Sequence, residues 1–300
     1  MNAGVSGRIS PAGMLQLAGA VVLLASAWPI TKAAIDAGAA PLWFAVGRAG
    51  FSALTAFAVL GALGRLRLPG RQDLPALAAV GSLQLAAFFG LAHAAVQFVP
   101  AGRTTVLSNV TTIFIVPLSL LVLREAISPR RWLSAGLALA GVVVLMGPWA
   151  IDWAAPGVLL GHMFLLAAAG CFALAIIAVR RFPPRLSMLQ LLPWCFALAT
   201  VLLLPLAMQH PGLGFWPASS RWAMFYIGGL AGPLGTWCVM QAAASLPAMV
   251  SSVGLLATPA AGLLFSHWWL AEPLGADLLI GTAMIIAGVG TASFPSRPRG

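Results

Sequence analysis

Ten apolar runs, each of about 20 residues, follow one another along this chain with only short polar connections between them. A run of that length, wound as a helix, matches the roughly 30 Å hydrocarbon thickness of a lipid bilayer. Hydrophobic residues make up 61% of the sequence and charged residues 7%, whereas a soluble surface needs roughly 25% charged residues. We therefore expect an all-α membrane protein. The expected spans are residues 13–35, 41–63, 74–96, 99–123, 131–150, 156–179, 187–208, 221–243, 246–270 and 275–294.

Basic residues are distributed unevenly between the two ends of these spans. Ten spans place both termini on one side, which carries Arg8, Arg65, Arg67, Arg71, Arg124, Arg130, Arg131, Arg180, Arg181, Arg185, Arg297 and Arg299. The other side carries Lys32, Arg103 and Arg221. Because basic residues concentrate on the cytoplasmic side, both termini are predicted to be cytoplasmic. The net charge of +10 does not indicate nucleic-acid binding, because the arginines form small clusters without stacking aromatic residues.

The second half of the sequence repeats the first at a fixed offset of 147 residues. Distinctive residue types coincide at this offset, among them Gly81 with Gly228, Pro100 with Pro247, Thr111 with Thr258, Ser119 with Ser266, and Glu125 with Glu272. We predict two domains, residues 1–150 and 151–300, each of five spans. Five is odd, so the second copy enters the membrane from the opposite side. Such inverted repeats place a solute site near the midplane and support alternating access; the alternative is a duplication kept for stability alone.

The end of each fourth span carries a resemblance to a known family. The segments from Thr112 to Leu123-Arg124-Glu125 and from Pro259 to Leu270-Ala271-Glu272 each precede a glycine-rich span. They resemble tandem EamA domains of the drug/metabolite transporter superfamily, although Thr112 stands where the second copy has Pro259. The resemblance covers nearly the whole chain. Within the superfamily, the sequence is most similar to the bacterial aromatic amino-acid exporters of the YddG type.

This resemblance implies a function and a location. It implies a multi-pass transporter of the bacterial inner (plasma) membrane that exports small organic solutes, aromatic and other amino acids first, with broad specificity. The alternative is an exporter of drugs, lipophilic cations or other metabolites with the same fold. The implied partners are a small-molecule solute and the lipid bilayer, and the sequence leaves open whether the chain forms a homodimer.

Two basic side chains inside the spans are candidates for solute binding. Arg48 lies about seven residues into the second span, where a charge costs roughly 2.5–3.5 kcal/mol on insertion scales. It could bind a substrate carboxylate through two hydrogen bonds, or it could cap carbonyl groups of a neighbouring helix. His93 in the third span is either a cavity-lining residue or a neutral, hydrogen-bonded packing residue.

Polar residues are concentrated in the fourth span. Thr105, Ser108, Asn109 and Thr112 have the i, i+3, i+4, i+7 spacing of one helical face. We expect Asn109, Thr105 and Thr112 to face the solute. The alternative is that these side chains join helices by hydrogen bonds within the bundle.

The eighth span carries an aromatic and an amide side chain beside a proline. Pro233, Trp237 and Gln241 are spaced by four residues and share a helical face. Because proline removes a backbone hydrogen bond, we expect an opening there, with Trp237 stacking on a ring and Gln241 holding a polar group. The small residues at the equivalent positions of the first copy would leave a pocket opposite this face. A kinked structural helix is the alternative.

Other function classes lack their sequence signals. The chain has no nucleophile elbow, zinc helix, phosphate loop or intramembrane aspartate pair, so we expect neither an enzyme nor a cofactor. The three cysteines lie apart in apolar runs and predict no disulfide framework and no metal site. The chain also has no repeated filter sequence of the kind that would indicate an ion channel. All six carboxylates lie at span ends or in loops, which favours transport down a solute gradient. The fifth and tenth spans, rich in small residues, are expected to form a peripheral scaffold.

Overall fold

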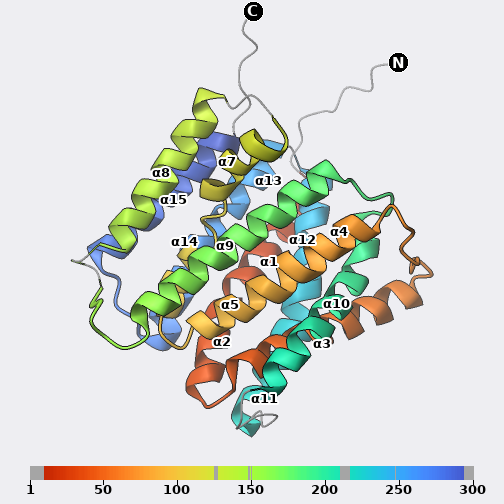
Figure 1. The fold of residues 1–300 in the computed structure, drawn as a ribbon, viewed down its shortest axis with the longest axis horizontal. Coiled ribbons are helices and arrows are strands. Elements are labelled where there is room, and N and C mark those ends of the chain that lie inside the picture. The colour runs from red at the N-terminus through yellow and green to blue at the C-terminus, as the bar shows by residue number, and fades with distance from the viewer. Residues whose placement is uncertain are drawn as a thin grey trace, which may run out of the picture.

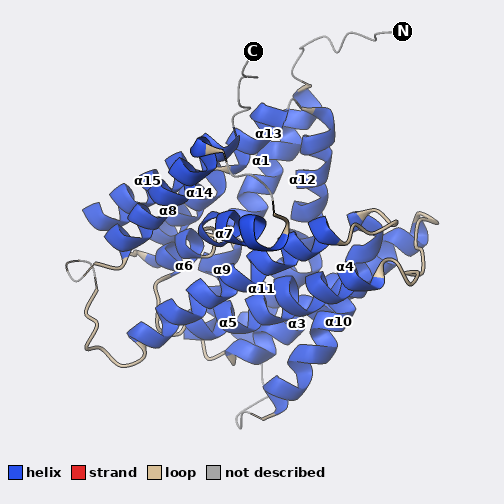
Figure 2. Cartoon of the chain, turned by 45° about the horizontal axis from the view of Figure 1, so that its top comes forward, coloured by secondary structure: helices blue, strands red, loops and turns tan. Residues whose placement is uncertain are grey.

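The computed structural model describes residues 10–124, 128–147, 149, 151–209, 217–246 and 248–293. All of its regular elements in these residues are helices (Figures 1 and 2). Several residues named above lie outside the described ranges, namely Glu125, Pro247 and the terminal arginines Arg8, Arg297 and Arg299.

The helices form ten consecutive segments. The first five are α1 (Pro11–Ala25) with α2 (Ala27–Asp36); α3 (Pro41–Ala62); α4 (Leu74–Ala79), η1 (Val80–Ala87) and α5 (Phe88–Ala95); α6 (Ala101–Leu107) with α7 (Thr112–Val122); and α8 (Pro129–Leu145). The other five are α9 (Val158–Arg181); α10 (Met188–Met208); α11 (Ala218–Met224), η2 (Phe225–Ala231) and α12 (Gly232–Ser245); α13 (Ala248–Leu255) with α14 (Ala257–Leu270); and α15 (Ala276–Ser293). The elements η1 and η2 are π-helices.

Seven of these ten segments are long and apolar enough to cross a membrane. The other three are α8, the α13–α14 pair and α15. The all-helical membrane architecture predicted from the sequence is confirmed. The described chain begins and ends on the same side, at the top of Figure 1. We call this the basic side, because Arg65, Arg67 and Arg71 lie in the loop between α3 and α4, and Arg180, Arg181 and Arg185 lie at the end of α9 and in the loop that follows it; the other is the opposite side.

Short sequence signals set where several helices begin. Proline occupies the first turn of α1, α3 and α8, where its missing N–H group is not needed for the helix. At the start of α10, the hydroxyl of Ser187 accepts the backbone N–H of Gln190, and the Gln190 side chain accepts the backbone N–H of Ser187. This reciprocal pair is a capping box, which satisfies two N–H groups that the helix leaves free.

Backbone irregularities recur at the 147-residue offset. The π-helix η1 in the third segment overlaps η2 in the eighth when the offset is applied. Arg124 and Ala271, which are one offset apart, both have a φ of 53°. The fourth segment is interrupted around Asn109 and the ninth at Leu256, again one offset apart. The similarity between the two halves therefore extends from residue types to backbone conformation.

Helices α8 and α15 pack against each other along one edge of the molecule (Figures 1 and 2). A Cβ atom on Gly141 would lie 2.7 Å from the carbonyl oxygen of Gly281, and one on Gly288 would lie 2.8 Å from that of Ser134. Gly141 and Gly288 are one offset apart, as are Ser134 and Gly281, so the two contacts are reciprocal. Small residues let the two backbones meet. The fifth and tenth segments thus form a scaffold of the kind expected.

One carboxylate joins the two halves on the basic side. Asp73, which is 3% exposed, accepts the backbone N–H groups of Arg185 at 2.7 Å, Leu186 at 3.0 Å and Gly70 at 2.9 Å. It therefore ties the loop after α3 to the loop before α10. The N–H groups, that of Leu186 first and that of Gly70 next, hold the pKa of Asp73 below its ordinary value, although partial desolvation acts in the opposite direction.

The α8–α15 contact predicts a position-specific effect of added methyl groups. Gly141→Ala should separate the two helices and destabilise the protein by about 1–3 kcal/mol. Gly136→Ala, in the same helix, meets nothing within 4 Å and serves as the matched control. The measurement is the melting temperature in detergent. Equal melting temperatures for the two variants would contradict the contact described here.

The hydrogen bonds of Asp73 predict an acid-dependent stability. Folding lowers the pKa of this carboxyl. Its contribution to stability is therefore complete above the pKa of the unfolded state, about 3.9, and is lost as the pH falls through the pKa of the folded state. Asp73→Asn should therefore lower the melting temperature at pH 7, and the difference from wild type should shrink below about pH 4. Asp36→Asn, which removes an exposed pair with Lys32, should have little effect at either pH. A difference for Asp73→Asn that does not vary with pH would refute this account.

Candidate functional site

Two polar residues predicted from the sequence, Arg48 and His93, lie together among aromatic rings. The ring of His93 lies 5.7 Å from that of Trp28 and 5.8 Å from those of Phe44 and Phe89, measured between centroids. The guanidinium carbon of Arg48 lies 4.2 Å from the centroid of Phe89 and 5.7 Å from that of Trp28. We call these five residues the aromatic chamber. They come from α2, α3 and α5.

The chamber contains two polar atoms without hydrogen-bond partners among the described residues. The Nδ1 atom of His93 lies 2.7 Å from the carbonyl oxygen of Phe89. Because a carbonyl oxygen only accepts, Nδ1 carries the hydrogen, and in the neutral ring Nε2 is then an acceptor. This Nε2 atom is buried and unpartnered, as is the Nη1 donor of Arg48. The chamber thus holds one unmet acceptor and one unmet donor.

The energetic balance in the chamber is unfavourable without a ligand. Leaving a buried polar group unsatisfied costs about 1–3 kcal/mol, and more when the group is charged. The rings of Phe89 and Trp28 offset part of this cost for Arg48, because a cation over an aromatic face is stabilised by about 0.5–2 kcal/mol. His93, which is fully buried, has no comparable compensation at Nε2. A polar group that met both atoms would remove this cost.

A close approach between the two halves fixes the position of Arg48. The hydroxyl of Ser52, one turn along α3, donates a 2.8 Å hydrogen bond to the carbonyl oxygen of Gly228 in η2. A Cβ atom on Gly228 would lie 2.8 Å from the carbonyl oxygen of Arg48. The missing side chain at Gly228 therefore allows η2 to pack directly on the backbone that carries Arg48.

The fourth segment is interrupted where the sequence predicted a continuous polar face. Residues 108–111 form a turn between α6 and α7, and the N–H of Asn109 bonds to Val106 instead of Thr105. The amide nitrogen of the Asn109 side chain and the hydroxyl of Ser108 both donate to the Thr105 carbonyl, at 2.7 and 3.0 Å. These side chains replace the lost backbone donor. Asn109 itself is exposed near the middle of the segment.

The two threonines predicted on that face have different surroundings. Thr105 is 1% exposed, its hydroxyl donates to the carbonyl of Ala101 at 2.8 Å, and it packs against Gly262 of α14. Thr112 is half-buried at the first position of α7. The helix interruption separates the two threonines, so a single helical face does not present both.

Trp237 and Gln241 lie on one continuous helix, α12, together with Pro233. The expected opening at Pro233 takes the form of the π-helix η2, which ends just before it. Trp237 is 38% exposed and, with Pro233, lines a cavity of about 450 Å³ that reaches Leu63 and Arg65 on the basic side. We call this cavity the α12 pocket. Gln241 is half-buried one turn further along.

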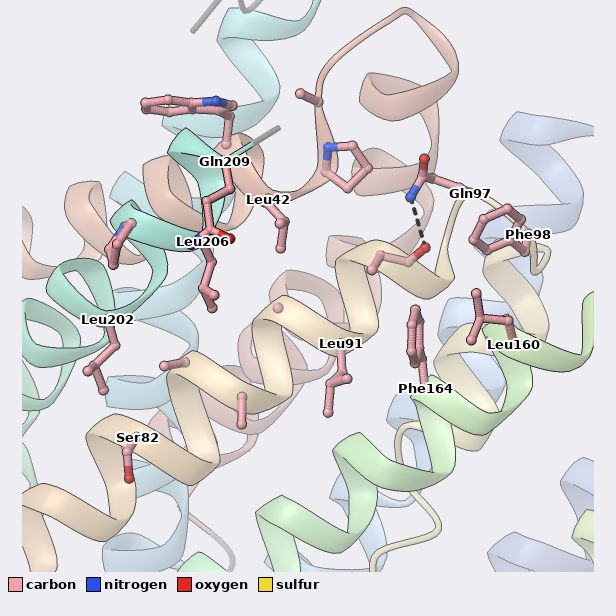
Figure 3. Close-up of a pocket in the computed structure, with 18 residues that line it drawn as sticks. Leu42, Ser82, Leu91, Gln97, Phe98, Leu160, Phe164, Leu202, Leu206 and Gln209 are labelled. Atoms are coloured by element: carbon pink, nitrogen blue, oxygen red, sulfur yellow. Dashed lines mark hydrogen bonds between the residues drawn. The ribbon is translucent and has the colours of Figure 1, made fainter. Parts of the chain in front are cut away.

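A second cavity, of about 940 Å³, lies along α5 near the opposite side (Figure 3). We call it the α5 pocket. Its floor is formed by small residues of η1 and α5, and its walls by Leu202 and Leu206 of α10 and by Leu160 and Phe164 of α9. Its polar side chains, Ser82, Gln97 and Gln209, stand apart from one another in Figure 3.

The two pockets are related by the 147-residue offset. Corresponding residues line both, namely Leu42 and Leu189, Ser82 and Gly229, Ala86 and Pro233, Gly90 and Trp237, Leu202 and Thr55, and Leu206 and Val59. The sequence had suggested one pocket, with the small face opposite the bulky face. Instead, each face lines its own cavity, one near each side of the membrane. The smaller volume of the α12 pocket follows from Trp237 occupying the position of Gly90.

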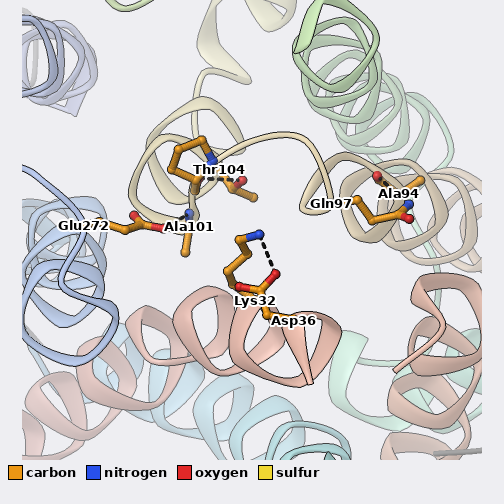
Figure 4. Close-up of polar contacts among 8 residues, drawn as sticks. Lys32, Asp36, Ala94, Gln97, Ala101, Thr104 and Glu272 are labelled. Carbon is orange, nitrogen blue, oxygen red and sulfur yellow. Dashed lines mark hydrogen bonds and ion pairs between the residues drawn. The ribbon is translucent and has the colours of Figure 1, made fainter. Parts of the chain in front are cut away.

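Charged contacts hold the two halves together on the opposite side. Glu272 accepts the backbone N–H groups of Ala101 and Gly102, at 2.6 and 2.8 Å, at the start of α6 (Figure 4). Arg103 forms a 2.5 Å ion pair with Asp277 of α15. A carboxylate at a helix N-terminus is favourable because the N–H groups there lack partners within the helix. These contacts join α6 of the first half to the end of α14 and to α15 of the second half.

Sequence reasoning found Arg48 and His93 but missed the aromatic rings around them. Trp28, Phe44 and Phe89 are ordinary members of apolar runs, and nothing in their local pattern distinguishes them from core residues. The available signal was the spacing of four between Phe44 and Arg48 and between Phe89 and His93, which places each ring beside its polar partner.

Ten helical segments in two similar halves, with pockets at corresponding positions, define a multi-pass membrane carrier of small solutes. The chain belongs to the EamA-like transporter family, whose model matches residues 11–147 and 159–294. It is therefore a transporter and not an enzyme.

Several individual proteins are similar to this chain. A probable terminal-alkyne amino-acid exporter of Streptantibioticus cattleyicolor is 28% identical over 90% of this chain and 89% of its own length. The uncharacterized transporter YdfC of Bacillus subtilis is 26% identical over 89% and 86%. An S-adenosylmethionine uptake transporter of Rickettsia prowazekii is 28% identical over about half of each chain, 52% and 51%. One protein of known crystal structure has the same fold, with a TM-score of 0.63, 22% identity and coverage of 95% and 96%.

The packing of η2 on α3 predicts different effects at two adjacent glycines. Gly228→Ala should displace η2 from the backbone of Arg48 and destabilise the protein by about 1–3 kcal/mol. Gly229→Ala should be tolerated, because its Cβ would lie 3.7 Å from the nearest atom, the hydroxyl of Thr55. Chemical denaturation of both variants in mixed micelles measures the difference. A Gly229 variant as unstable as the Gly228 variant would show that the approach at Gly228 is not special.

Proposed function

We propose that this protein exports small organic solutes, first of all aromatic and other amino acids, by alternating access between two repeats, residues 1–150 and 151–300. The observation that carries the proposal is the pair of pockets at corresponding positions, the α5 pocket near one side and the α12 pocket near the other. In inverted repeats, exchange of the two halves' conformations would open one pocket and close its counterpart.

Two observations support amino acids as the solutes. The relative from Streptantibioticus cattleyicolor, described as a probable amino-acid exporter, matches nine-tenths of this chain. The aromatic chamber offers a cation and rings together, which suits a solute with both a carboxylate and an apolar part. Among members of the family, we propose the YddG type of aromatic amino-acid exporter, for which the aromatic rings of the chamber are the support.

We assign roles in solute binding to the seven residues selected from the sequence. Arg48 and His93 act in the aromatic chamber, and Trp237 and Gln241 act along α12. Asn109 presents an exposed amide at the interruption between α6 and α7, Thr105 holds that amide through its carbonyl group, and Thr112 begins the next helix.

The proposed location is the bacterial inner membrane, with the basic side in the cytoplasm, because arginine-rich loops remain on that side. The contacts of Glu272 and Arg103 hold α6 to α14 and α15 on the other side. We propose that these contacts change when the two repeats move during export. The partners are the solute and the lipid bilayer; homodimer formation is a separate question for solution measurements.

A lipophilic-cation exporter of the same fold is the competing function. The buried guanidinium of Arg48 argues against it, because a positive charge in the chamber repels a cationic solute. Uptake is the competing direction, since one partial relative is described as an S-adenosylmethionine uptake transporter. Both alternatives can be tested in the same assay.

The test is counterflow of labelled tryptophan and phenylalanine in proteoliposomes, with unlabelled amino acids, S-adenosylmethionine and tetraphenylphosphonium as competitors. We expect saturable exchange that amino acids inhibit. Trp237→Ala should change the preference between tryptophan and alanine as competitors, whereas Trp149→Ala, an exposed tryptophan outside both pockets, should not.

Three results would redirect the proposal. Inhibition only by tetraphenylphosphonium would favour the cation exporter, and inhibition only by S-adenosylmethionine would favour that solute class. Accumulation of tryptophan against its gradient under an imposed pH gradient would refute transport driven by the solute gradient alone.

A further inference from the structure

We propose that the aromatic chamber binds the zwitterionic head group of an α-amino acid, with the carboxylate on Arg48 and the ammonium group on Nε2 of His93. The inference rests on the proposed function and deepens it, because it names the part of the solute that this site recognises. It distinguishes amino acids from the corresponding amines and acids.

The first step is the missing counterion of Arg48. Five carboxylates lie in the described residues, and each contacts a different group. Asp36 pairs with Lys32, Asp277 with Arg103, Glu272 with the start of α6, Asp73 with three backbone N–H groups, and Asp152 with the N–H of Ala154. The buried Nη1 of Arg48 has no hydrogen-bond partner among the residues that the structure describes. A solute carboxylate supplies the planar acceptor that a guanidinium fits best.

The second step is the unmet acceptor of His93. Its Nδ1 donates to Phe89, so Nε2 of the neutral ring presents a lone pair inside a fully buried side chain. A carboxylate cannot satisfy a lone pair, but an ammonium N–H can. A solute that carries both a carboxylate and an ammonium group can therefore satisfy both atoms together.

The third step is that Arg48 and His93 contact the same two aromatic rings. Arg48 and His93 both lie against Trp28 and Phe89, so the residues that carry the unmet donor and the unmet acceptor are neighbours around the same two rings. In an α-amino acid, both charged groups are attached to the same carbon atom. A solute with widely separated charges could not place both groups between one pair of rings.

Access to the chamber requires movement of helices α3 and α5. His93 is fully buried, whereas the adjacent residue Ala94 lines the α5 pocket. Phe44 is likewise fully buried, and Trp43 lines the pocket. The same two helices thus separate the chamber from a cavity near the opposite side. The bound head group would be released when this separation opens.

The experiment compares three ligands that share an indole ring: tryptophan, tryptamine, which lacks the carboxylate, and indole-3-propionate, which lacks the ammonium group. Binding is measured by thermal shift and titration calorimetry on the purified full chain in detergent. We expect tryptophan to bind at least about tenfold more tightly than either analogue, because a site built for both groups rejects ligands that lack one.

Two variants should lose different parts of this discrimination. Arg48→Gln should bind tryptophan and tryptamine about equally while still rejecting indole-3-propionate. His93→Phe, which keeps an aromatic ring, should bind tryptophan and indole-3-propionate about equally while still rejecting tryptamine. Arg48→Lys should partly restore the discrimination lost in Arg48→Gln. Arg71→Gln, in an exposed loop, is the control and should behave as wild type.

The crossed pattern separates recognition from misfolding, because a damaged protein would lose affinity for all three ligands together. Equal binding of the three ligands by wild type overturns the inference, as does no binding of any. If tryptophan exchange occurs in proteoliposomes but the analogues compete equally, the proposed function stands and the inference fails. If head-group-dependent binding occurs without exchange, the chamber assignment stands and the transport function fails.

Discussion

The structure depends on one constraint, which is that lipid offers no hydrogen-bond partner to a backbone group. Helices satisfy this constraint along most of the chain, and the informative places are those where a helix is interrupted. At Ser26, between α1 and α2, the side-chain hydroxyl donates to the Leu23 carbonyl and contacts the hydroxyl of Tyr226. Between α6 and α7, the side chains of Ser108 and Asn109 donate hydrogen bonds to the Thr105 carbonyl. Each interruption is repaired locally, so it can occur within a span.

The two halves of the protein have similar backbone conformations but different side chains at corresponding positions. The π-helices, the interruption of the fourth segment and the glycine contacts recur at one offset, whereas the interruption at Ser26 does not, because α9 is continuous there. The aromatic chamber does not recur: Cys195, Thr236 and Met240 stand at the positions that correspond to Arg48, Phe89 and His93. Symmetry of the backbone supplies two related conformations of the whole molecule, whereas the side chains that form the aromatic chamber are confined to the first half.

The amino-acid sequence predicts the helical segments, their number and the repeat, because hydropathy and residue identity depend on local composition. It also selects Arg48 and His93, since buried polar residues are rare in spans. It could not place Thr105 and Thr112 correctly, because the helix interruption between them depends on hydrogen bonds made by Ser108 and Asn109. Nor could it show that Gly90 and Trp237 line separate cavities, since that depends on how distant helices pack.

The reciprocal contacts between α8 and α15 have a mechanical consequence. Backbone meets backbone at Gly141 and Gly281, and again at Gly288 and Ser134. With two such contacts along one pair of helices, any motion that separated α8 from α15 would lose both contacts together. If these contacts persist while one half rocks against the other, helices far from this edge, such as α3 and α10, move farther than α8 and α15.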